Sequence, residues 1–248
     1  MDDNTKIGYG DSVLYQMCEG EHIRHNSLDT VAGKMWLIGR SYAASPERRQ
    51  GKKVKKIDNI DIEKKLQSRT DADFFDKVAD LILKSGDNKE LDEKIADLCE
   101  AQYSYSDFDS DMDVLSKTVE LIKLFNEMVM EASDKYNKSR YEKVGHTLKE
   151  GERVAQNNIS FASKYLHFHL PNIVFIMDNI SLKNGKEKYS EIKNKEVSDK
   201  LKEKREGRYK EYTEHALRCY CIAKKLKEEK KGYSPRAIDN VLMSRNNQ

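Results

Sequence analysis

The strongest constraint on the fold is the spacing of apolar residues between positions 109 and 136. They recur three or four residues apart, which places them on one face of an α-helix. The positions are Val114, Leu115, Val119, Ile122, Phe125, Met128 and Val129. The 248-residue chain contains only 3 prolines and 12 glycines, so few residues interrupt such helices. We therefore predict a mainly α fold with little or no sheet.

The same spacing predicts further helices along the chain. We expect a helix over 29–45, with Asp29 as its N-cap, and helices over 11–19, 71–85 and 235–243. The charged stretch 196–231 has a sparse apolar stripe, so we expect a long helix that stands partly clear of the body. The organisation that fits is a single helical domain over 1–248, with alternative subdomains 1–70 plus 140–248, and 71–139.

Charge is distributed in blocks, although the net charge is only +2. Residues 34–69 hold 11 Lys and Arg against 4 Asp and Glu, and residues 183–231 hold 17 against 10. Between them, residues 71–113 hold 4 against 14. A polyanion could lie against the basic blocks while the acidic block points away. For the charge runs alone, solvated helix faces are the simpler interpretation.

Cysteine usage and hydropathy indicate the compartment. Cys18, Cys99, Cys219 and Cys221 fit neither a zinc pattern nor a disulfide framework, which favours thiols in a reducing cytosol. No apolar run approaches the ~20 residues that a membrane helix needs. We predict a cytoplasmic protein without a membrane partner.

One short segment concentrates reactive side chains. Residues 160–179 read SFASKYLHFHLPNIVFIMDN. Asn158 can cap a helix through residues 160–170, which Pro171 ends. The apolar run NIVFIM, residues 172–177, then reads as a buried extended segment with Asp178 at its end. A lysine buried near a helix start loses its proton more readily and becomes a nucleophile. A carboxylate beside Lys164 could accept a proton or stabilise a cationic sugar carbon.

A simpler interpretation remains open for this pair. Lys164 could be exposed and Asp178 could cap the next helix, and spacing alone favours that interpretation. His167 and His169 are two residues apart and do not share a helix face, so we predict no metal site.

The segment ASKYLHFHLPNIVFIMD, residues 162–178, resembles the catalytic stretch of helix-hairpin-helix DNA glycosylases. That superfamily usually carries Gly-x-Gly in its hairpin, and NNISFAS of this chain contains no glycine. RSYAASPERR (residues 40–49) and PRAID (residues 235–239) are similar to segments of small bacterial proteins associated with phage defence. One of those is a glycosylase that acts on glucosylated hydroxymethylcytosine.

The resemblance implies a helical glycosylase-like domain with two subdomains that excises a modified base and leaves an abasic site. Lys164 would be the nucleophile and Asp178 the essential aspartate. Double-stranded DNA would be the partner of a monomer, and no cofactor or metal would be needed.

We also predict residues that contact DNA around this centre. Phosphate and strand contacts are expected from Arg40, Tyr42, Arg48, Arg49, Ser160 and Ser163. A pocket for the flipped base is expected from Trp36, Tyr165, His167 and His169, for which core packing is the alternative.

Two other functions remain open from the sequence. The chain could be a non-catalytic helical module that binds nucleic acid or protein through its charged helices. The acidic loop 107–113 also leaves room for a metal-dependent nuclease.

Overall fold

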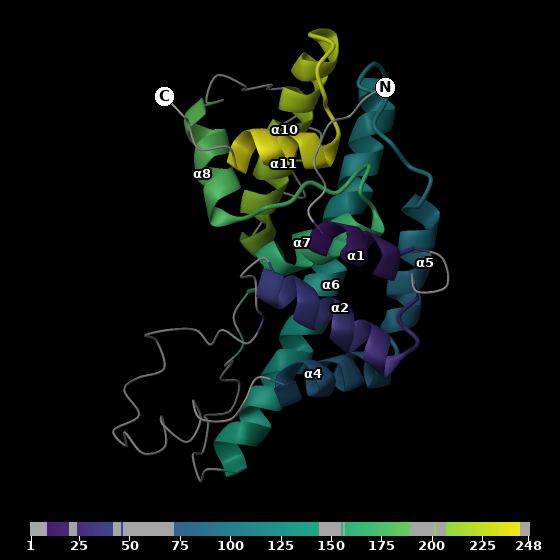
Figure 1. Cartoon of the computed structure of the whole chain (residues 1–248), viewed down its shortest axis with the longest axis vertical. Helices are drawn as coiled ribbons and strands as arrows, with labels where there is room; N and C mark the ends of the chain where they lie inside the picture. The colour runs from purple at the N-terminus through teal and green to yellow at the C-terminus, as the bar shows by residue number, and fades with distance from the viewer. Residues whose placement is uncertain are drawn as a thin grey trace.

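Helix α6 (Phe108–Lys143) runs through most of the length of the molecule, and the other helices assemble around it (Figure 1). The computed structural model describes residues 9–19, 24–41, 46, 72–143, 155, 157–188, 201 and 207–243. The 36 residues of α6 give a helix of roughly 54 Å. Leu115, Ile122, Phe125 and Val129 are completely buried on its predicted apolar face. The predicted helix is therefore confirmed, and it continues to Lys143.

Four shorter helices come before α6 in the chain. They are α1 (Tyr9–Met17), α2 (Leu28–Ser41), α4 (Ala72–Ser85) and α5 (Asn88–Leu98). Helix α2 packs against α4, and both α4 and α5 pack against α6. Asp29 lies in the first turn of α2 instead of preceding it. The predicted end of this helix, at residue 45, lies outside the described residues.

The helices after α6 include α7 (Ile159–His169), which carries Lys164. The others are α8 (Asn179–Lys188), the 3₁₀ turn η3 (Gly207–Tyr209), α10 (Lys210–Glu228) and α11 (Pro235–Met243). Helix α7 contacts α1, α2 and α6, and α11 lies against both α8 and α10. Every residue of α7 except Ser160 is buried, so this short helix sits inside the protein.

The prediction that 196–231 forms one helix standing partly clear of the body is wrong. Leu201 lies in a turn and is buried, η3 begins at Gly207, and α10 extends from Lys210 to Glu228. Tyr212, Ala216 and Tyr220 are almost completely buried. The count of apolar residues underestimated the width of the buried face of α10, because Thr213, His215 and Cys219 are buried on it as well.

Buried apolar side chains form one continuous core. It includes side chains from α1, α2, α4, α5, α6, α7, α10 and α11. Within the described residues the protein is mainly helical with no strand or sheet, as predicted. None of the described helices is long and apolar enough to span a membrane. The division into subdomains stays a prediction.

Four histidines lie in this core, namely His25, His167, His169 and His215. Burial lowers the pKa of all four, to about 4 for His167 and His215. The Nδ1 atom of His167 is 2.8 Å from the carbonyl oxygen of Val174, which can only accept a hydrogen bond. Nδ1 therefore carries the proton, and in the neutral ring Nε2 accepts from Tyr15 at 3.0 Å. The fold requires these rings to be neutral.

We therefore expect the free energy of unfolding to fall between pH 7 and pH 5. The folded-state pKa values lie below the unfolded value of about 6.5, so the unfolded chain binds more protons as the pH drops. His167 and His215 should each contribute a loss on the order of 1–2 kcal/mol. Urea denaturation at pH 7 and pH 5 measures this change. Stability that stays constant or rises on acidification would contradict neutral buried histidines.

Candidate functional site

The site is organised by the extended run between α7 and α8, which includes residues 173–178. It is buried up to Met177, yet within the described chain no strand pairs with it. Side chains satisfy its carbonyl oxygens instead. The bonds are Tyr103 to Ile173 at 3.0 Å, His167 to Val174 at 2.8 Å, Tyr212 to Phe175 at 3.2 Å and His215 to Ile176 at 2.9 Å. Unpaired buried carbonyls would be costly, so these donors fix the path of the run.

Ser163 of α7 fixes the register between the helix and the extended run. Its hydroxyl accepts a hydrogen bond from the backbone N–H of Met177 at 3.0 Å. Ser163 is completely buried, so this contact is protected from water. Lys164 is the next residue on α7, and Asp178 is the next residue on the run. The buried serine therefore brings these two side chains together.

Lys164 and Asp178 form an ion pair at the edge of the core. The distance from Lys164 Nζ to Asp178 Oδ2 is 3.5 Å, with 4% of the lysine side chain exposed and 18% of the aspartate. Burial lowers the pKa of the Lys164 ammonium below its usual range, while the carboxylates of Asp178 and Asp239 oppose that shift. The exposed alternative for Lys164 is thus wrong. The pair combines a desolvated amine with a carboxylate that solvent can reach.

Asp178 also caps the next helix, as the simpler interpretation expected. Its Oδ1 accepts hydrogen bonds from the backbone N–H of Ile180 at 2.9 Å and of Ser181 at 2.8 Å. The two functions use different oxygens, since Oδ2 faces Lys164. Capping therefore holds the carboxylate rigidly, which suits a group that must stay beside a reacting atom.

Asp239 of α11 adds a second carboxylate that the sequence analysis did not assign to the site. Its Oδ2 accepts from Arg236 Nη1 at 3.1 Å, and its buried Oδ1 has no hydrogen-bond partner. Burial, together with the nearby Asp178 carboxylate, raises the pKa of Asp239 to about 6, although Arg236 opposes this. The sequence did contain a signal for this contact, because Arg236 and Asp239 are three residues apart on a predicted helix and therefore lie on the same face.

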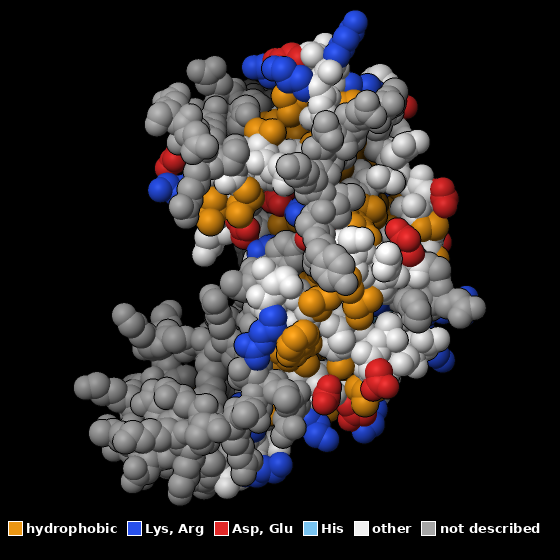
Figure 2. All heavy atoms as spheres, viewed as in Figure 1, with side chains coloured by type: hydrophobic (Ala, Val, Ile, Leu, Met, Phe, Trp, Pro, Cys, Tyr) orange, Lys and Arg blue, Asp and Glu red, His pale blue; other side chains and the backbone are white. Residues whose placement is uncertain are grey.

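Helix α1 closes the site from the other side. Asp11 bonds to Arg236 Nη2, and Tyr15 bonds to His167. Helices α1, α7 and α11, with the start of α8, therefore meet at this cluster. Figure 2 shows acidic and basic side chains interspersed with apolar ones over the described surface of this face.

Asn158 occupies the N-cap position of α7, but its side chain makes no capping hydrogen bond. Its backbone N–H donates to Asn126 of α6 at 2.9 Å. The predicted helix start is thus confirmed in position, while the capping interaction is not present. A contact with the central helix takes its place.

The residues predicted to line a base pocket divide into exposed and buried ones. Trp36 is 48% exposed, whereas Tyr165, His167 and His169 are buried. Tyr165 donates to His25 Nε2 at 2.9 Å, because His25 Nδ1 is bonded to Asp92 at 2.6 Å. In this conformation Tyr165, His167 and His169 pack in the core, which was their alternative interpretation.

The residues predicted to contact DNA phosphates are only partly described. Tyr42, Arg48 and Arg49 lie outside the described residues. Arg40 is exposed at the end of α2, with its guanidinium carbon 6.0 Å from the centre of the Phe75 ring. Ser160 is partly exposed at the start of α7, and Ser163 is buried.

Lys34 is a second buried lysine, on α2. Its Nζ lies 3.4 Å from His169 Nε2, and burial lowers its pKa. Lys34 is completely buried, unlike the Lys164–Asp178 pair, whose aspartate reaches solvent. We therefore take Lys164 as the candidate site lysine. Among the described residues, no group of three or more His, Cys, Asp or Glu could hold a metal ion.

No protein-family model matches the chain, and no curated protein or solved structure matches it significantly. The resemblance to the glycosylase superfamily therefore stays a prediction from the residues. The chemistry of the site has to support any functional proposal.

We expect Tyr212→Phe to lower the free energy of unfolding by about 1–3 kcal/mol, because it leaves the buried carbonyl of Phe175 without a donor. Urea denaturation of wild type and variant measures the difference. Tyr233→Phe is the matched control, since Tyr233 is 39% exposed and its change should stay below about 0.5 kcal/mol. Equal effects at the two positions would show that the extended run does not depend on its side-chain donors.

We expect Asp239→Asn to raise the melting temperature at pH 8 and to change it little at pH 5. The folded-state pKa of Asp239 lies above its unfolded value, so its stabilising contribution is present at low pH and is lost as pH rises through about 6.

Asp111→Asn is the matched control for this prediction. Asp111 is also buried, but it accepts hydrogen bonds from the backbone N–H groups of Ser104 and Tyr105, each at 2.7 Å, and from the Tyr220 hydroxyl at 2.8 Å. Its substitution should destabilise the fold at pH 8. If Asp239→Asn lowers the melting temperature at pH 8, the ionised Asp239 carboxylate does not destabilise the folded protein, and the prediction is wrong.

Proposed function

We propose that the chain is a DNA glycosylase that flips a modified base out of double-stranded DNA and cleaves its bond to C1′ of deoxyribose. The observation that supports this most strongly is the buried Lys164 amine 3.5 Å from the partly exposed carboxylate of Asp178. Cleavage of a glycosidic bond needs an anion beside the developing sugar cation and a nucleophile to complete the displacement. The pair supplies both groups.

In the reaction, the C1′–N bond breaks and its electron pair leaves with the base, which takes up a proton. The Asp178 carboxylate stabilises the positive charge on C1′. The neutral Lys164 amine attacks C1′. One of its two protons passes by way of Asp239 to the departing base, and the other passes to the ring oxygen as the C1′–O bond breaks, which gives a neutral Schiff base. Hydrolysis of the Schiff base releases the abasic site and the free lysine. In a purely hydrolytic variant, a water held by Lys164 and Asp178 attacks instead.

Asp239 provides a place for the proton that Lys164 loses. A carboxyl group with a pKa of about 6 exchanges protons readily near neutral pH. It has to be ionised to accept, and Lys164 has to be neutral to attack. Both requirements make the rate increase with pH, and ionisation of Asp239 places one inflection near pH 6.

The resemblance supplies the substrate class, which is modified cytosine in phage DNA. DNA would lie where Trp36 and Arg40 are exposed, so that the indole can stack on a base and the guanidinium can bind a phosphate. A monomer is sufficient, because the described groups of the centre all come from one chain. The proposed chemistry needs neither a metal nor an organic cofactor.

The test incubates the protein in EDTA with duplex DNA that contains cytosine, hydroxymethylcytosine or glucosylated hydroxymethylcytosine. An aldehyde-reactive probe counts abasic sites, and borohydride traps a Schiff base. We expect abasic sites on modified DNA, with Asp178→Asn reducing the rate by at least about 100-fold. Lys164→Gln should abolish trapping, while Lys183→Gln, on the exposed face of α8, should leave both signals unchanged.

Two outcomes separate this proposal from its alternatives. Abasic sites without borohydride trapping would indicate the hydrolytic route. No abasic sites on any modified or damaged base, with DNA binding unaffected by Asp178→Asn, would favour the non-catalytic binding module. Cleavage of the phosphodiester backbone that requires magnesium would favour the nuclease.

A further inference from the structure

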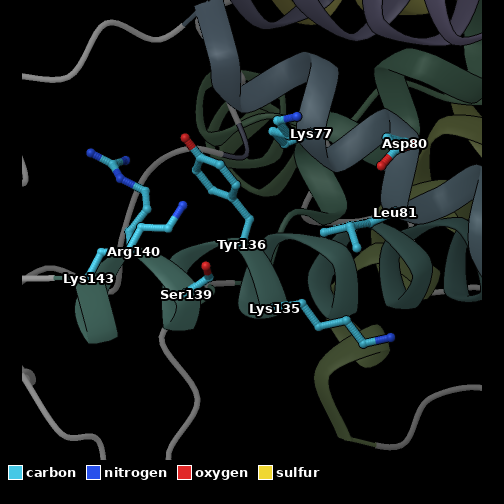
Figure 3. A pocket seen from close by; sticks show the side chains of 8 residues that line it. All are labelled: Lys77, Asp80, Leu81, Lys135, Tyr136, Ser139, Arg140 and Lys143. Atoms are coloured by element: carbon cyan, nitrogen blue, oxygen red, sulfur yellow. The ribbon is translucent and has the colours of Figure 1, made fainter.

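A basic groove lies between α4 and the last turns of α6, at the end of α6 away from α10 and α11 (Figures 1 and 3). Its volume is about 290 Å³. The residues that line it are Lys77, Asp80, Leu81, Lys135, Tyr136, Ser139, Arg140 and Lys143. In Figure 3, Tyr136 stands between Lys77 and the side chains of Arg140 and Lys143.

The charges that line the groove are strongly unbalanced. Four of the eight lining residues are cations and one is a carboxylate. That carboxylate, Asp80, already pairs with Lys84 at 2.8 Å. On α6, positions 136, 140 and 143 share one helix face, so their side chains converge on the same space. Like charges brought together in this way repel one another unless an anion lies between them.

The aromatic residue gives the groove a fixed shape. The Tyr136 ring packs edge-on against Phe74 with the ring centres 5.3 Å apart. The guanidinium carbon of Arg140 lies 5.6 Å from the centre of the Tyr136 ring. Such a contact orients a guanidinium. Arg140 is therefore held at the groove.

The helix dipole explains only some of these cations. Cations at the C-terminal end of α6 are stabilised by the helix dipole, which accounts for Arg140 and Lys143. Lys77 lies in the middle of α4, where the dipole gives no such preference. The helix dipole therefore does not explain why cations from both α4 and α6 line the same groove. An anionic ligand that binds between them does.

We propose that this groove binds a backbone phosphate of the DNA on which Lys164 acts. Its small volume suits a phosphate and adjoining sugar better than a large enclosed ligand. The Ser139 and Tyr136 hydroxyls supply neutral donors of the kind that contact phosphates. Exposed Arg40 adjoins α4 at Phe75, so the cations are not confined to the groove. This inference rests on the proposed function for the identity of the DNA.

A DNA duplex is long enough to span both the groove and the Lys164 site. Helix α7 packs against α6, and α6 is roughly 54 Å long. A duplex of about 24 base pairs extends roughly 80 Å at 3.4 Å per step. The contact would position the duplex and would not select its sequence, because phosphates carry no base identity.

The test measures binding of a fluorescein-labelled, unmodified 24-base-pair duplex by anisotropy between 50 and 200 mM NaCl. The variant Lys77→Gln/Lys135→Gln/Lys143→Gln removes three charges and keeps Arg140 against Tyr136. We expect its dissociation constant to rise about tenfold at 100 mM NaCl. The slope of log affinity against log salt should become smaller by roughly 1–2, because the variant neutralises fewer DNA phosphates and releases fewer counterions.

The control variant Lys89→Gln/Lys117→Gln/Lys123→Gln removes the same number of charges at exposed positions of α5 and α6 outside the groove. It should retain the wild-type slope. The inference is overturned if the two triple variants behave alike, if the groove variant keeps the wild-type slope, or if the wild-type protein does not bind the duplex. It is also overturned if inorganic phosphate stabilises the wild type and not the groove variant, while the variant still binds DNA normally. That result would indicate a site for small anions.

These outcomes are separate from those of the glycosylase test, since unmodified DNA undergoes no chemistry. A reduced salt slope in the groove variant without any abasic sites would support the groove and reject the glycosylase. Abasic sites with an unchanged salt slope would support the glycosylase and reject the groove.

Discussion

The structure depends on a buried extended run that no strand pairs with in the described part of the chain. Between Ile173 and Met177 the backbone passes through the core, where unpaired carbonyl groups would each cost about 1–3 kcal/mol. Tyrosine and histidine side chains from three parts of the chain supply the missing donors. A neutral histidine ring still has one N–H to donate to these carbonyls. His167 and His215 can therefore make the hydrogen bonds without a buried charge, in agreement with their lowered pKa values.

The reactive pair follows from this arrangement. Once Ser163 bonds to Met177, Lys164 and Asp178 must face one another at the end of the run. Helix capping holds one oxygen of Asp178 and leaves the other beside the lysine. Asp239 adds a buried carboxyl group whose Oδ1 has no hydrogen-bond partner within the protein. Burial and incomplete pairing at one place are typical of catalytic centres.

The glycosylase proposal and the basic groove concern two tasks of one enzyme, which are cleavage at C1′ and binding of the DNA backbone. Chemistry at C1′ needs a desolvated amine and an anion, and these lie among α7, α8 and α11. Holding DNA needs cations at the surface, and these gather between α4 and the end of α6. Because α6 contacts both α4 and α7, one rigid helix fixes the distance between the two regions. A phosphate contact at one end can then position a nucleotide at the other.

The sequence by itself determined the helices and the candidate pair. Apolar spacing predicted α6 because a long amphipathic stripe has few alternatives, and the Lys164 to Asp178 segment stood out by composition. The sequence could not show that α10 is buried, since its buried face includes Thr213, His215 and Cys219. It also gave no role to Asp239, and it could not decide whether Tyr165, His167 and His169 line a base pocket or pack in the core. Only the tertiary structure decided these points, because the pairing of a buried polar group depends on partners that are distant in the chain.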